Sequence, residues 1–168
     1  MAKKVTVLAN LGSPESPSVP DVRRYLAEFL MDKYVLDVPY LLRLFIVYGT
    51  ILPTRPKRTA HAYNTIWTAE GSPLVQTMKE TQKKVQEQTN TPLYLCMRYG
   101  NPSIDNCIKN ILEENPECTD IHLIPFYPQY AMSSTETLVE TFKEKLKYKI
   151  LNSNWKWRFE IKFFTFIS

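Results

Sequence analysis

The chain has 168 residues, of which 44% are hydrophobic and 23% are charged, and these values are typical of one globular domain with a sizeable core. Its 21 basic and 17 acidic residues leave a net charge of +4, which is too small to indicate a nucleic-acid partner. The four glycines lie too far apart to form a G-x-G-x-x-G or a glycine-rich phosphate-loop motif. The composition therefore excludes these two nucleotide-binding signatures.

The N-terminus and the cysteines favour a cytoplasmic protein. The first apolar run, Val5 to Ala9, is too short for the core of a signal peptide. Cys96, Cys107 and Cys118 are odd in number and contain no C-x-x-C pair, so they indicate neither a disulfide framework nor a cysteine zinc site. We therefore expect a reducing environment.

Short apolar runs alternate along the chain with segments of helical period. Three runs end in polar, proline-containing turns, as buried strands do: Val5–Ala9, Leu93–Met97 and Ile121–Ile124. Four segments have the spacing of amphipathic helices, and the first three open with Ser, Asp or Pro: Val19–Leu30, Pro73–Gln88, Ser103–Glu114 and Ser133–Tyr148. A last segment, Trp155–Ile167, is rich in residues that favour strands.

This alternation predicts an α/β fold with a four-stranded parallel sheet flanked by helices. Ligands of such sheets bind at the carboxyl ends of the strands, where the three polar turns lie. Pro14, Pro102, Pro125 and Pro128 restrict the backbone of these turns and preorganise the side chains beside them. A binding site is therefore expected at this edge.

A second candidate region contains no acidic residue from Val38 to Ala69. Its apolar part, Tyr40–Leu52, has 13 residues, fewer than the roughly 20 that a bilayer span requires, so we expect it to lie on a membrane or to line a pocket. Arg55 and Arg58 follow directly. An apolar site with a cationic rim suits a flat hydrophobic molecule that carries carboxylates, whereas the alternative is a surface loop with solvated charges.

Polar side chains at the predicted strand ends allow two interpretations each. For Arg98, one interpretation is that it binds an anionic group, and the other is that it satisfies a helix C-terminus or a neighbouring carboxylate. For Tyr127 and Tyr130, one interpretation is that they face a ligand, and the other is that they are packing residues. For the helix start at Ser133–Thr135, one interpretation is that it holds an anion, and the other is that it is a plain N-cap.

The two histidines do not indicate a metal site. His122 falls in the middle of a predicted strand, where we expect it to be buried, and His61 falls at the start of a basic helix, where we expect it to be exposed. No histidines or carboxylates have a spacing typical of metal ligands.

Five segments, in this order, resemble ferrochelatases of bacterial type. They are Leu8–Pro14 (LANLGSP), Val22–Asp32 (VRRYLAEFLMD), Ile66–Leu74 (IWTAEGSPL), Met97–Ser103 (MRYGNPS) and Pro125–Thr135 (PFYPQYAMSST). The resemblance covers essentially residues 5 to 150. It implies a fold of two similar Rossmann-like halves, of which this chain is the N-terminal half, with an α/β domain over residues 1–151 and a divergent end over 152–168.

The same resemblance implies an enzyme, a lyase of haem biosynthesis. Ferrochelatases insert ferrous iron into a porphyrin, protoporphyrin IX or coproporphyrin III, and release two protons. The family's catalytic histidine and its helper glutamate fall beyond the end of this chain, which therefore carries the porphyrin-clamping half. We expect activity only if the missing half is supplied by another chain; the alternative is a non-catalytic porphyrin- or haem-binding domain or an inactive fragment.

Individual positions also match the family. Leu11 matches a residue that touches the ring, and Tyr40–Leu52 resembles an apolar lip of the cleft. Arg55 and Arg58 match basic positions near the propionates, and Tyr63 and Ser72 match further pocket residues. Arg98 and Tyr127 match a supporting pair on the cleft face opposite the catalytic histidine.

The resemblance also implies the ligands and partners. Porphyrin and ferrous iron are substrates, no cofactor is permanently bound, and no metal ligand is assigned in this chain. Met132 stands where some members place the first cysteine of an iron–sulfur cluster, so no cluster is expected. We expect no nucleic-acid partner, peripheral membrane contact through Tyr40–Leu52, and either self-association or a C-terminal half supplied separately.

Overall fold

The structure is a computed structural model that describes residues 3–151 and 158–161. The chain divides into two compact units. The first, called the sheet unit, comprises the described residues of Met1–Leu11, Met78–Arg98 and Pro102–Ser168. The second, called the helical unit, comprises Gly12–Thr77 and Tyr99–Asn101.

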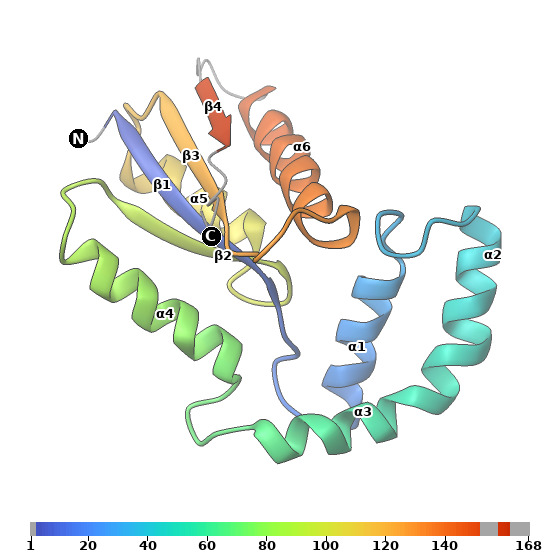
Figure 1. The fold of residues 1–168 in the computed structure, drawn as a ribbon. Coiled ribbons are helices and arrows are strands. Elements are labelled where there is room, and N and C mark those ends of the chain that lie inside the picture. Colours follow the sequence, from blue (N-terminus) through green and yellow to red (C-terminus); the bar gives the residue numbers. More distant parts are fainter. Residues whose placement is uncertain (1–2, 152–157, 162–168) are drawn as a thin grey trace. The chain divides into compact units, whose positions relative to one another are not determined.

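Four strands form one sheet in the order β2-β1-β3-β4, as Figure 1 shows. Their bounds are Lys4–Gly12 for β1, Leu93–Tyr99 for β2, Asp120–Pro125 for β3 and Arg158–Ile161 for β4. β1 pairs with β3 in parallel, from Lys4 opposite Asp120 to Ala9 opposite Pro125, and β3 pairs with β4 in parallel. The expected α/β fold is confirmed, with three parallel strands, β1, β3 and β4, and with β2 at the edge beside β1.

One face of this sheet is covered by two helices, α5 (Ile104–Glu114) and α6 (Thr137–Leu151). Val5, Val7 and Ala9 alternate along β1 and are fully buried in a core that they share with Ile108 of α5 and Phe142 of α6. Because side chains two residues apart in a strand share one face, this alternation produces the apolar surface on which the helices pack.

Helix starts follow the local sequence. Ser18 caps α1 (Val19–Leu30) by accepting a hydrogen bond from the amide of Asp21, and Ser103 caps α5 by accepting one from the amide of Asn106. A serine oxygen at this position satisfies an amide that has no partner inside the helix. The periodic segment that begins at Pro73 forms α4 (Pro73–Gln86), two residues shorter than predicted.

In the helical unit, three helical segments follow one another without a break. α2 (Tyr40–Leu44) continues into η1, a π-helical segment from Phe45 to Ile51, and then into α3 (Leu52–Ile66). Sequence analysis assigned no element to the apolar stretch and offered a surface loop for Arg55 and Arg58. That alternative is wrong, because both arginines lie in α3.

Three other local predictions also need correction. A π-helical segment, η2 (Met132–Glu136), precedes α6; its N-cap is Ala131, and no side chain caps it, so the predicted serine cap is wrong. His61 lies in the middle of α3 and is exposed there, not at a helix start. Arg98 lies inside β2 rather than just beyond it.

Three of the four glycines have the left-handed backbone that favours this residue. Gly12, Gly71 and Gly100 have positive φ angles, whereas Gly49 lies within η1 and does not. Of the predicted strand segment Trp155–Ile167, residues Arg158–Ile161 form β4, and the other positions lie outside the described residues.

Candidate functional site

The carboxyl ends of β1 and β3 lie side by side in the sheet unit. Their ladder ends at Ala9 opposite Pro125, and the amide of Phe126 donates a 2.7 Å hydrogen bond to the carbonyl oxygen of Ala9. Leu11 and Tyr127 each follow this last pair by two residues.

The strand order reverses between β1 and β3. The connection after β1 leads to β2 on one side, whereas the connection after β3 leads to β4 on the other side. In open parallel sheets, ligands bind outside the carboxyl ends of the strands at such a reversal. The topology therefore singles out the edge that holds Leu11 and Tyr127.

Arg98 is held at the carboxyl end of β2 by a contact with α6. Its Nε donates a 2.8 Å hydrogen bond to Oγ1 of Thr137, the first residue of α6, which is fully buried. This partner is a hydroxyl at a helix start, not a helix C-terminus. The hydrogen bond brings the end of β2 next to the segment that follows β3.

Tyr127 lies two residues beyond the end of β3. Its ring packs against the core of the sheet unit, as a packing residue does. The side chain as a whole is half-buried, and its hydroxyl oxygen is buried. Leu11, Arg98 and Tyr127 thus come from three neighbouring strands and lie near the same ends of those strands.

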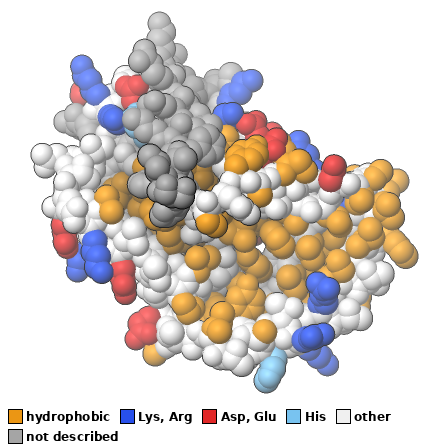
Figure 2. Space-filling view, in the orientation of Figure 1, with side chains coloured by type: hydrophobic (Ala, Val, Ile, Leu, Met, Phe, Trp, Pro, Cys, Tyr) orange, Lys and Arg blue, Asp and Glu red, His pale blue; other side chains and the backbone are white. Residues whose placement is uncertain are grey.

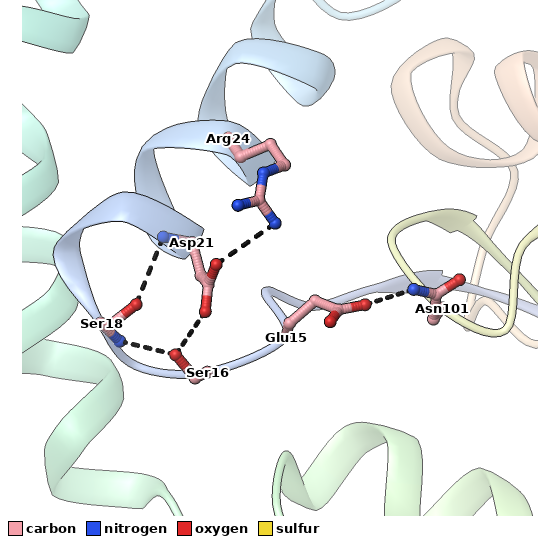
Figure 3. A network of polar contacts seen from close by, with 6 residues as sticks. All are labelled: Glu15, Ser16, Ser18, Asp21, Arg24 and Asn101. Atoms are coloured by element: carbon pink, nitrogen blue, oxygen red, sulfur yellow. Dashed lines mark hydrogen bonds and ion pairs between the residues drawn. The ribbon is translucent and has the colours of Figure 1, made fainter.

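In the helical unit, the loop that follows β1 is fixed by a network of polar contacts, shown in Figure 3. Oγ of Ser16 donates a 2.5 Å hydrogen bond to the carboxylate of Asp21, Arg24 forms an ion pair of 3.2 Å with the same carboxylate, and Asn101 donates to Glu15. The hydrogen bond from Ser16 is the main cause that lowers the pKa of Asp21 below its ordinary value. These contacts link the loop to the start of α1 and to the turn after β2.

The face of α2 and η1 is strongly apolar and exposed. Leu41 is 77% exposed, Phe45 67% and Tyr40 62%, and Figure 2 shows apolar side chains gathered on the right of the view, over these elements. Isolated apolar residues at a surface are ordinary, but a contiguous patch indicates a binding surface. The lip that the resemblance implies, Tyr40–Leu52, is therefore a helical segment with an exposed apolar face.

Arg43, in the middle of this apolar segment, points inward. Its guanidinium donates to the carbonyl oxygens of Leu36 at 2.9 Å, Met31 at 3.1 Å and Val38 at 2.8 Å, and the side chain is buried. Five N–H groups in a fixed fork suit this task. Arg43 therefore fixes the loop before α2 and leaves the exposed face of the segment without a cation of its own.

The other cations of the acid-free region lie on α3. Arg55 and Arg58 are exposed and, with Thr54, Thr59 and Ala62, line a surface hollow of about 540 Å³. These positions recur every three or four residues, so they share one face of the helix. The structure brings Arg55 and Arg58 together, one turn apart.

Tyr63 and Ser72 occupy other positions in the helical unit. Tyr63 is half-buried near the end of α3, where its ring meets that of Tyr25 edge-on at a centroid distance of 6.5 Å. Ser72 is buried immediately before α4 and accepts a backbone hydrogen bond from Gln76 through its carbonyl oxygen. Neither residue lines the hollow that Arg55 and Arg58 form.

Sequence analysis missed three residues that hold site residues or their supporting segments: Tyr25, Arg43 and Thr137. Tyr25 and Thr137 lie within segments that were predicted to be helical, but nothing local distinguishes them from ordinary helix residues. A basic residue inside an apolar run is a usable signal for Arg43, because a cation in such a position needs buried partners.

The described residues contain no obvious metal centre or membrane span. Among residues 3–151 and 158–161, no three or more His, Cys, Asp or Glu side chains gather in a way that could hold a metal ion. No helix in the same part of the chain is long and apolar enough to cross a bilayer. The thiols of Cys96, Cys107 and Cys118 are free and buried.

Comparison with known proteins identifies the family. Residues 3–165 match the ferrochelatase family. The ferrochelatase of Opitutus terrae is 48% identical over 142 residues, which cover 83% of this chain and 41% of that protein. Those of Azotobacter vinelandii and Pseudomonas fluorescens are 45% and 46% identical, over 88% and 90% of this chain and 43% and 44% of their own length.

The chain thus spans about two-fifths of the length of these curated relatives. The family match nevertheless extends over almost all of its residues, and it includes all five segments on which the resemblance was based. On this evidence, the chain belongs to the ferrochelatase family.

Proposed function

We propose that this chain binds a porphyrin and is the porphyrin-clamping part of a ferrochelatase, an enzyme of haem biosynthesis. The substrates of the complete enzyme are ferrous iron and protoporphyrin IX or coproporphyrin III. Besides membership of the family, one observation carries the proposal: within the helical unit, an exposed apolar face and an exposed cationic face occur on one continuous helical stretch.

These two faces suit the two parts of a porphyrin. The macrocycle is flat and apolar, and it gains free energy when it leaves water for side chains such as Leu41 and Phe45. The propionates are anionic, and the guanidinium groups of Arg55 and Arg58 match a carboxylate in shape and charge. We assign Tyr63 and Ser72 to the same carboxylate side of the ligand.

For the strand ends of the sheet unit, we propose the roles that the resemblance to the family implies. Leu11 touches the ring, and Arg98 and Tyr127 act in support, on the side where the metal or the released protons are handled. Their place at a reversal of strand order supports this assignment. The hydrogen bond from Arg98 to Thr137 supports it as well, because it orients the guanidinium.

Metal insertion makes two demands on such an enzyme. The macrocycle has to bend so that the lone pairs of its nitrogens become accessible, which requires a rigid surface against the ring. Two protons also have to leave those nitrogens. We propose that this chain meets the first demand and that the second depends on the part of the family's length that it does not span.

The exposed apolar face also suits peripheral contact with a membrane. Aromatic and leucine side chains insert at the boundary between lipid headgroups and acyl chains, and nearby cations attract anionic headgroups. Lys57 and His61 are exposed on α3, beside Arg55 and Arg58. We propose this contact as a secondary property of the same surface.

Absorption spectroscopy tests the proposed function. Protoporphyrin IX is titrated with the purified chain, and zinc or ferrous ion is then added under anaerobic conditions. We expect a shifted Soret band on binding and no metalloporphyrin spectrum from the chain alone. The double variant Arg55→Ala/Arg58→Ala should bind the porphyrin about tenfold more weakly, because it loses charge-assisted hydrogen bonds to the carboxylates.

A matched control uses two exposed lysines of α4, in the variant Lys79→Ala/Lys83→Ala, which should retain wild-type affinity. Metallation by the chain alone would contradict the division of labour proposed above. If the chain does not bind the ring at all, the proposed function is wrong.

A further inference from the structure

The hydroxyl groups of the threonines in η1 and α3 are of two kinds. Thr50, Thr54 and Thr65 each donate a hydrogen bond, at 2.5, 2.8 and 2.8 Å, to a backbone carbonyl oxygen three or four residues earlier. The hydroxyl of Thr59 has no hydrogen-bond partner within the part of the chain that the structure describes. Because a hydroxyl has a single proton to donate, Thr59 differs from the other three in keeping that proton available.

Thr59 lies in the surface hollow that Arg55 and Arg58 line. Arg58 and Thr59 are the third and fourth residues after Arg55, so both lie one helical turn along the same face of α3. The side chain of Thr59 is half-buried, and part of it is therefore open to the hollow. Ala62, one turn further along, lines the same hollow with a single methyl group and so occupies little of its volume.

The charges of this face are not balanced by carboxylates of the chain. Among residues 3–151 and 158–161, neither Arg55 nor Arg58 forms an ion pair, and residues 38–69 contain no Asp or Glu. Two cations one turn apart on a helix repel each other. An anion in the hollow removes this repulsion, so the site favours a negatively charged group over a neutral group of the same shape.

We propose that Thr59 is a further binding residue of this site, whose hydroxyl donates a hydrogen bond to the porphyrin carboxylate that Arg55 and Arg58 bind. This inference rests on the proposed function. A carboxylate has two oxygens with about four positions that accept hydrogen bonds, so the fork of an arginine leaves room for a hydroxyl beside it. Thr59 thus adds a directional donor to two flexible cations.

Three substitutions separate the hydroxyl from the shape of the side chain and from the hollow. Thr59→Val keeps the branched shape and replaces the hydroxyl with a methyl group, whereas Thr59→Ser keeps the hydroxyl. Thr54→Val is the matched control, because Thr54 lines the same hollow but already donates to the carbonyl oxygen of Thr50. Dissociation constants of protoporphyrin IX and of its dimethyl ester, in the same detergent, are measured for the full chain and for each variant.

We expect Thr59→Val to weaken binding of the free acid about threefold to tenfold, because a hydrogen bond to a charged acceptor is lost. Binding of the ester should change less than about twofold, since the ester has no charge that draws it between the arginines. Thr59→Ser and Thr54→Val should bind the acid within about twofold of the wild type. In the Arg55→Ala/Arg58→Ala background, Thr59→Val should have little further effect, because the two arginines and Thr59 act on one carboxylate.

Three results would overturn the inference. The first is wild-type affinity for the acid in Thr59→Val while Arg55→Ala/Arg58→Ala has lost affinity, and this result leaves the proposed function intact. The second is a loss that Thr59→Val shows equally for acid and ester, or that Thr59→Ser shares in full, since either assigns the effect to packing. The third is a wild-type chain that does not distinguish acid from ester, and this result rejects both the inference and the carboxylate contacts of the proposed function.

Discussion

Gly100 shows how strictly one position limits the residue that can occupy it. Its φ is +75°, and a Cβ at this position would lie 2.6 Å from the carbonyl oxygen of Ser13. That oxygen belongs to the backbone, which cannot move aside as the end of a flexible side chain can. Gly100 therefore allows the turn after β2 to approach the loop after β1, next to two of the proposed site residues in sequence, Arg98 and Leu11.

The substitution Gly100→Ala should lower the free energy of unfolding by about 1–3 kcal/mol, because it combines an unfavourable φ with a backbone clash. Unfolding in urea measures this loss. Gly49→Ala is the matched control, since its Cβ would make ordinary contacts of 3.5 Å with the Phe45 ring, and we expect wild-type stability or a gain of up to about 1 kcal/mol. Equal stability of Gly100→Ala and the wild type would show that this turn relaxes without cost.

At the scale of the element, α2 and η1 present an exposed apolar face, whereas the arginine within them, Arg43, is buried and stabilises the preceding loop. Arg43 satisfies three carbonyl oxygens of the preceding loop, so the segment is fixed from the inside while Leu41 and Phe45 remain available outside. This separation of roles predicts that the exposed face can be altered without unfolding the unit.

The double variant Leu41→Glu/Phe45→Glu should bind protoporphyrin IX at least tenfold more weakly, because each side chain loses apolar contact worth about 1–3 kcal/mol and gains a charge that repels the carboxylates. Its melting temperature should stay close to that of the wild type, because both side chains are more than half exposed. Ile66→Glu, at a 57% exposed residue of α3, is the control for the added charge. Unchanged porphyrin affinity in the double variant would remove this face from the site.

At the scale of the whole molecule, the length of the chain decides which activity can be tested. The aligned segment covers 43% of the Azotobacter vinelandii ferrochelatase. Replacing that segment with the matching residues of this chain gives a protein of the relative's full length. We expect such a chimera to insert zinc into protoporphyrin IX, since 45% identity preserves the fold of the replaced part.

In this chimera, Arg98→Ala should lower kcat at least tenfold while the melting temperature falls by only a few degrees, because the side chain lies at a strand end and is half-buried. Arg24→Ala, at an exposed residue of α1, is the matched control and should retain full activity. Full activity of the Arg98 variant would reject the supporting role proposed for this residue.

Much of the fold could be read from the sequence, because its causes are local. Apolar alternation places Val5, Val7 and Ala9 on the buried face of β1, and Ser18 and Ser103 cap their helices through contacts three residues away. The predicted bounds of Val19–Leu30 agree with those of α1 for the same reason. The cationic rim at Arg55 and Arg58 was inferred from their place beside the apolar stretch and from the absence of acidic neighbours, and it stays a prediction.

Other features required the tertiary structure, because their partners are distant in the sequence. Arg98 is 39 residues from Thr137, and Tyr25 is 38 residues from Tyr63, so no local pattern could pair them. The inward turn of Arg43 depends on carbonyl groups that a folded loop brings together. The sequence by itself determined the family and the alternation of strands and helices, since these depend on residue type and period, whereas only the folded chain decided which polar side chains are held by partners distant in the sequence.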